Sequence, residues 1–177
     1  MLDFLLRRKR DGQAGRVPAP PPTFPDQNAY ERMWEAIQNL PIDDPKAAKP
    51  LSFRLAREQG WSREFTLRVM EEYRRFLFLM AVSDHSVTPS ITVDEAWHLH
   101  LIYSKSYWED LCLYTVGKPM HHNPSGGSAD EESGFKDDYR ETLILYRRFF
   151  GEPPADIWGP ENGKNVTALV EIKARFD

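Results

Sequence analysis

The sequence has little cysteine and no long hydrophobic run. Cys112 is the one cysteine among 177 residues, so the chain can form neither an internal disulfide framework nor a cysteine-based zinc finger. Any metal site must therefore use histidine and carboxylate ligands. No apolar segment approaches the roughly 18 residues that a membrane-spanning helix needs, and the apolar start is too short for a signal-peptide core. We expect a soluble, cytoplasmic protein.

Positive charge is scarce beyond the first 16 residues. The chain carries 23 Lys and Arg against 27 Asp and Glu, which gives a formal net charge of −4. Residues 1–16 hold five of the basic and two of the acidic side chains, which leaves 18 basic against 25 acidic for the rest. Such an acidic body is poorly suited to the phosphate backbone of nucleic acids. We expect no nucleic-acid partner.

Residues 1–27 are predicted to form a disordered tail. They contain a short apolar patch, a basic cluster at residues 7–10 and the proline-rich stretch PAPPPTFP. Proline fixes φ and lacks an amide donor, so this stretch favours an extended linker over a packed element. The tail could recruit a protein partner, and its patch and cluster could make weak peripheral contact with an anionic membrane.

Apolar residues recur with the helical period of about 3.6 along most of the remaining chain. The predicted helices span residues 28–40, 52–60, 62–82, 93–114 and 135–150. Ser52, Ser62 and Thr92 are the expected N-caps, and Thr92 with Glu95 matches the capping-box pattern. The sequence therefore predicts an all-α fold, an irregular bundle of about five helices.

The predicted domain covers residues 28–160. Its fourth and fifth helices are joined by a long connection, residues 117–134, and connections of this length are usually functional or disordered. Residues 161–177 form a C-terminal extension whose apolar pattern fits a strand or a helix equally well.

Four of the five histidines occur in two close pairs, His98/His100 and His121/His122. Residues two apart on a helix project about 200° from each other, so His98 and His100 cannot bind one ion together. Asp94 precedes His98 by four residues, and the two side chains face each other. A carboxylate and an imidazole at this spacing can bind Zn²⁺ or Fe²⁺, or the carboxylate can orient the imidazole as a general base.

Asp94 and His98 alone would make an incomplete metal site, because zinc sites use three protein ligands and a water, or four protein ligands. The missing ligand would come from His121 or His122, brought back over the helix by the long connection. Adjacent residues of an extended loop point apart, so one of them would bind. The alternative is that Asp94 only stabilises the N-terminus of the helix, through the terminal amides and the helix dipole, and that both loop histidines are solvated.

Five further residues are predicted to support the fold or the metal ligands: Trp97, His100, Tyr103, Tyr107 and Cys112. His100 lies in the apolar half of the helical wheel and is expected to be a core histidine bonded to a carbonyl or a tyrosine. Cys112 is expected to be a buried free cysteine. The sequence contains no phosphate-binding loop, nucleophile elbow, H-E-x2-H motif or paired C-x2-C motif.

The stretch VDEAWHLHLIYSKSYWEDLC, followed by GKPMHH, resembles the N-terminal domain of the glycine-rich domain-containing protein family. The resemblance runs through Asp94, Trp97, His98 and His100 to the HH pair, and weaker likeness extends it over roughly residues 60–160. It implies a helical domain but no established reaction. With only 10 glycines, the chain lacks the glycine-rich tail of the plant members.

Two functions remain open on the sequence. The first is a helical domain that binds a divalent metal ion through Asp94, His98 and either His121 or His122, and that uses the ion in metal-assisted hydrolysis. The second is a non-enzymatic protein-interaction module in which the histidines are structural and the tail or the acidic segment ADEESG recruits a partner.

Overall fold

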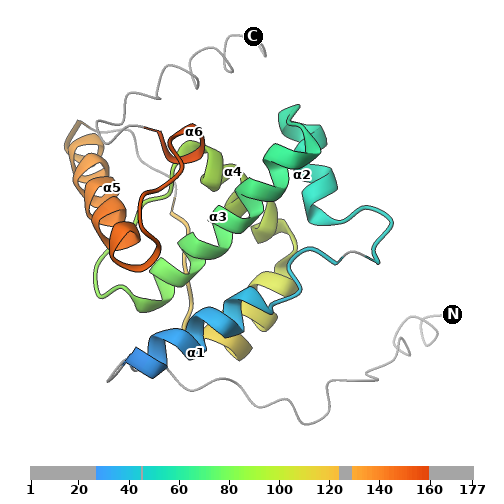
Figure 1. The fold of residues 1–177 in the computed structure, drawn as a ribbon, viewed down its shortest axis with the longest axis horizontal. Helices are drawn as coiled ribbons and strands as arrows, with labels where there is room; N and C mark the ends of the chain where they lie inside the picture. The colour runs from blue at the N-terminus through green and yellow to red at the C-terminus, as the bar shows by residue number, and fades with distance from the viewer. Residues whose placement is uncertain (1–26, 45, 124–128, 160–177) are drawn as a thin grey trace, which may run out of the picture.

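The computed structural model describes residues 27–44, 46–123 and 129–159 (Figure 1). The tail predicted over residues 1–27, of which only Gln27 is described, and the extension predicted over residues 161–177 lie outside these ranges. The tail-based interaction function therefore has no structural counterpart among the described residues.

The described residues form helices and no strand, which confirms the all-α class. The helices are α1 (Gln27–Gln38), α2 (Leu51–Gln59), α3 (Arg63–Val82), α4 (Ile91–Ile102), the π-helix η1 (Lys105–Val116), α5 (Ala129–Phe150) and α6 (Ala155–Trp158). The predicted number of about five is too low, because the fourth predicted helix is divided into α4 and η1 and because the short α6 follows α5. None of these helices is long and apolar enough to cross a membrane.

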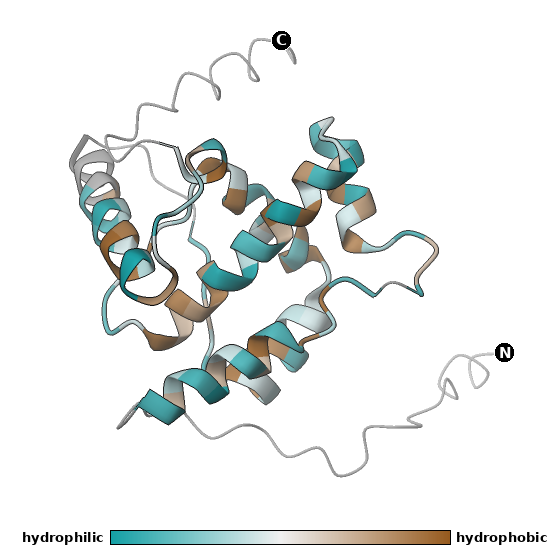
Figure 2. Ribbon diagram, viewed as in Figure 1, coloured by the Kyte–Doolittle hydropathy of each residue, from teal (hydrophilic) through white to brown (hydrophobic). Residues whose placement is uncertain are grey.

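Helix α3 is the centre of the fold and packs against α1, α2, α4 and α5 (Figure 1). It begins after Ser62, whose side chain accepts a hydrogen bond from the Phe65 amide at 3.1 Å, as the sequence predicts. Its Tyr73, Phe76 and Leu77 are fully buried. Hydrophobic and hydrophilic bands alternate around the helices in Figure 2, the pattern of helices with one buried face.

Three predicted helix starts are wrong. Ser90, and not Thr92, caps α4 by accepting from the Val93 amide at 3.2 Å, so no capping box forms. Pro50 occupies the N-cap of α2 in place of Ser52. Helix α5 begins at Ala129, inside the segment predicted to be a connection, so that connection is shorter than expected.

The predicted helix over residues 93–114 breaks at Tyr103, where φ is −82° and ψ is 60°. The chain resumes as η1, whose wider turn is closed by bonds such as that from the Gly117 amide to the Cys112 carbonyl, five residues back. His98 and His100 stay on one helix, whereas Tyr107 and Cys112 lie on the other. A single helical wheel therefore cannot relate these two pairs, which was the error in the prediction.

Candidate metal centre

Asp94 and His98 stand on the first turns of α4. The Asp94 amide donates to the Ser90 carbonyl at 2.8 Å, so the capped helix begins just before the carboxylate. Four residues later the His98 Nε2 lies 3.6 Å from Asp94 Oδ2. The helix geometry thus places an imidazole and a carboxylate side by side, as the spacing predicts.

The segment after η1 brings His122 to the same place. Gly117 ends η1 with a φ of 77°, a left-handed conformation that favours glycine, and the chain then turns back towards α4. His122 Nε2 reaches Asp94 Oδ1 at 2.8 Å. The His122 ring lies 4.5 Å from the His98 ring and 4.3 Å from the Trp97 ring, measured between centroids.

Asp94, His98 and His122 therefore form a cluster whose ligand atoms all lie within 4.8 Å of one another. Bonds of 2.0–2.1 Å to a tetrahedral ion would set ligand atoms about 3.3 Å apart, so small side-chain movements suffice to bind one ion. The side chain of His98 is 51% exposed, which leaves the cluster open to solvent. His121 points elsewhere: it is exposed and its ring lies 5.7 Å from that of Trp108.

Trp97 packs against the His122 ring, and Tyr107 and Cys112 bond to Trp97 or to the backbone of Met120, two residues before His122. The Tyr107 hydroxyl donates to the Met120 carbonyl and accepts from Trp97 Nε1 at 2.9 Å. Burial raises the pKa of the Cys112 thiol, although a hydrogen bond with the Met120 backbone lowers it. All three side chains are buried, and Cys112 is a free cysteine.

His100 and Tyr103 lie away from the cluster. His100 is fully buried, with Nδ1 2.8 Å from the Tyr73 hydroxyl and Nε2 2.9 Å from Ser106 Oγ. Burial, with a smaller effect of the Arg74 charge, lowers the pKa of His100 to about 4. Both ring nitrogens are occupied, so His100 is not available to an ion. Tyr103 is hydrogen-bonded to the Arg54 guanidinium of α2, and the hydrogen bond of that arginine with Glu58, followed by the one with Tyr103, raises its pKa.

Glu95, predicted only as part of a capping box, is a neighbour of the cluster. Its Oε2 accepts from Gln59 Nε2 of α2 at 2.8 Å, and burial raises its pKa while the charge of His98 lowers it. The sequence contains a pattern that could have pointed to Glu95: Asp94-Glu95-x-x-His98 has the spacing of an H-E-x2-H motif, with aspartate in place of the first histidine.

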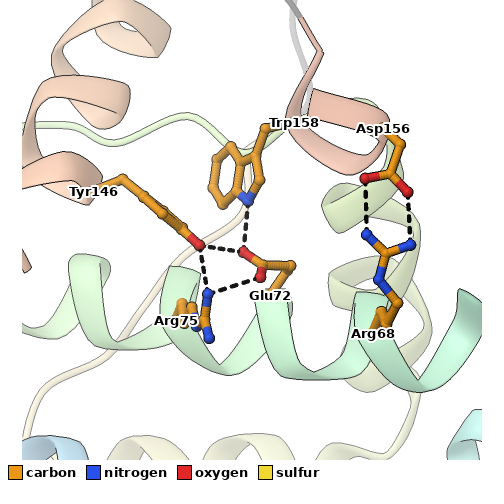
Figure 3. A network of polar contacts seen from close by, with 6 residues as sticks. All are labelled: Arg68, Glu72, Arg75, Tyr146, Asp156 and Trp158. Carbon is orange, nitrogen blue, oxygen red and sulfur yellow. Dashed lines mark hydrogen bonds and ion pairs between the residues drawn. The ribbon is translucent and has the colours of Figure 1, made fainter. Parts of the chain in front are cut away.

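A second polar cluster, in the middle of α3, was not predicted (Figure 3). The buried Glu72 accepts from the Tyr146 hydroxyl at 2.7 Å and from Trp158 Nε1 at 2.8 Å, and it pairs with Arg75 at 3.0 Å. The signal in the sequence was a carboxylate directly beside the core residue Tyr73. These bonds attach α5 and α6 to α3, so the role of this cluster is structural.

The sequence model of the UCP032817-like family matches residues 42–145. Comparisons with curated proteins and with solved structures found no match. The family match is silent on glycine-rich domain proteins, and that resemblance stays a prediction. The matched residues include the whole of α2, α3, α4 and η1 together with Asp94, His98 and His122. Because they make up more than half of the chain, the protein belongs to the UCP032817-like family.

Proposed function

We propose that this protein binds one divalent metal ion, Zn²⁺ or Fe²⁺, through Asp94, His98 and His122. The observation that supports the proposal is the convergence of three ligand atoms within 4.8 Å, although His122 is 24 residues beyond His98 in the sequence. Two imidazoles and one carboxylate suit both catalytic zinc sites and non-haem iron sites. Three protein ligands leave a coordination position for water.

The reaction class that fits this arrangement is metal-assisted hydrolysis. A bound divalent ion lowers the pKa of its water towards neutrality and so supplies a nucleophile. The half-exposed His98 keeps the cluster within reach of a substrate from solvent.

Glu95 is the residue that would accept a hydrogen bond from the metal-bound water. It follows the first ligand directly and precedes His98 by three residues, so its side chain is a helical neighbour of His98. The Gln59 hydrogen bond to Oε2 fixes the carboxylate. In H-E-x2-H sites the glutamate at this position is the general base.

Metal content of protein purified without a histidine tag tests the proposed site. We expect elemental mass spectrometry to find close to one zinc or iron ion per chain, and we expect the metal to be lost in Asp94→Asn and in His98→Ala. His85→Ala serves as a matched control, since His85 is an exposed histidine outside the cluster. Wild-type protein that holds no metal, and takes up none when zinc or ferrous iron is added, would refute the proposal.

The Glu95→Gln variant tests the hydrolytic role, with 4-nitrophenyl acetate as the probe. We expect full zinc content and a rate lowered by about 10²-fold or more, the usual contribution of a general base. Glu58→Gln is the control, because Glu58 is a surface carboxylate on the neighbouring α2 that pairs with Arg54. A Glu95→Gln rate equal to that of the wild type would exclude this role.

A further inference from the structure

The segment that carries His122 is anchored two residues earlier, at Met120. The Met120 carbonyl accepts from the Tyr107 hydroxyl, its backbone is hydrogen-bonded to Cys112, and its side chain is buried. The position of His122 over α4 therefore depends on contacts with η1, an element that supplies no ligand itself.

The ring of His122 is held from a second side by Trp97, whose ring centroid lies 4.3 Å away. The Trp97 Nε1 donates to the same Tyr107 hydroxyl, at 2.9 Å. One buried hydroxyl group thus bonds both the backbone that leads to His122 and the indole that packs against its imidazole. Tyr107 is itself fully buried, so water cannot replace either bond.

We infer that Tyr107 is a positioning residue of the metal centre: its hydroxyl fixes His122 in the place from which it can bind the ion. This inference rests on the proposed function. Without the hydroxyl, the Met120 carbonyl and the Trp97 indole each lose their partner and must shift to find another. His122 would then have to be ordered during metal binding, which lowers the affinity.

A Tyr107→Phe variant should keep the buried side chain of Met120 and its backbone bond to Cys112, because neither involves the Tyr107 hydroxyl. The chain near Met120 is therefore still attached to the core in that variant. The expected consequence is a weaker metal site on a folded protein.

The test is a calorimetric titration of the metal-free, full-length chain with zinc. We expect the Kd of Tyr107→Phe to rise about tenfold or more, in the range seen when groups that support metal ligands are removed. The absorption spectrum of the cobalt-substituted variant should also change, because the coordination of His122 changes. Tyr146→Phe is the matched control: it removes a fully buried hydroxyl with two hydrogen bonds, but one that lies in the structural cluster around Glu72. Its zinc Kd should equal that of the wild type.

A second variant keeps the inference testable if Tyr107→Phe does not fold. Trp97→Phe keeps an aromatic ring beside His122 but removes the indole N–H that donates to Tyr107, so its Kd should also rise. Wild-type affinity in a folded Tyr107→Phe variant, or an equal loss of affinity in Tyr146→Phe, would overturn the inference and leave the proposed site intact. A wild-type chain that binds no zinc or iron would refute the site, and the inference with it.

Discussion

At the scale of the residue, burial and neighbours divide the histidines into different roles. His100 is fully buried with both ring nitrogens bonded, whereas His98 is half exposed beside a carboxylate. His122 is tied to Asp94, and its neighbour His121 is exposed. Residues of one chemical type therefore supply one core hydrogen-bonding group and two members of the cluster around Asp94.

Buried tyrosine hydroxyls make the stability of the protein sensitive to alkaline pH. Burial raises the pKa of Tyr139 to about 12, while in the unfolded chain it ionises near its ordinary value of about 10. Between these pH values the unfolded state loses the proton first, so the free energy of unfolding falls as the pH rises, by about 2 kcal/mol for this group.

We expect Tyr139→Phe to lose less stability than the wild type between pH 10 and pH 12 in urea denaturation. Burial also raises the pKa of Tyr107 and of Tyr146, so the dependence should decrease without vanishing. Identical slopes in the two proteins would contradict this assignment.

The separation of His98 from His100 could be predicted from the sequence, because it follows from the 100° rotation per residue of any helix. The choice between His121 and His122 could not, since it depends on the bonds that hold Met120 to Tyr107 and Cys112. Glu95 was misassigned because Ser90, and not Thr92, is the N-cap of α4, and the Glu95 carboxylate bonds instead to Gln59 on another helix.

At the scale of the element, tertiary contacts decide where helices end and how they are attached. No proline or glycine occurs near the break at Tyr103, and the apolar pattern of the sequence continues through it. The attachment of α6 likewise depends on residues that are distant in sequence, among them the buried Glu72 with its partners Tyr146 and Trp158, and the Arg68–Asp156 pair. Local patterns contain neither piece of information.

Substitutions of the two carboxylates in Figure 3, Glu72 and Asp156, test which contacts hold α6 to α3. Glu72→Ala should lower the free energy of unfolding by about 3–5 kcal/mol, because it leaves the buried Tyr146 hydroxyl and Trp158 indole without their acceptor and removes the carboxylate that pairs with the partly buried Arg75. Asp156→Ala breaks the exposed pair with Arg68 and should change the unfolding midpoint far less, since exposed ion pairs contribute little. Equal effects of the two substitutions in denaturant unfolding would contradict the structural role of Glu72.

At the scale of the whole molecule, the fold brings a helix and a distant loop together to make the site. The helical period predicts the all-α class, since it reflects burial of one face of most helices. The last turns of α3 differ, because the four consecutive residues 76–79 are all buried. The return of the chain from η1 to α4 is a long-range event: it needs the left-handed Gly117 and the buried Tyr107, and no local spacing encodes it.

The most direct test of the central claim compares His122→Ala with His121→Ala, two adjacent substitutions of the same kind. Zinc titration of the two metal-free proteins should show that His122→Ala has lost the site while His121→Ala keeps the wild-type affinity and a stoichiometry near one per chain. Equal affinities in the two variants, or a loss confined to His121→Ala, would contradict the assignment of Asp94, His98 and His122 as one metal centre.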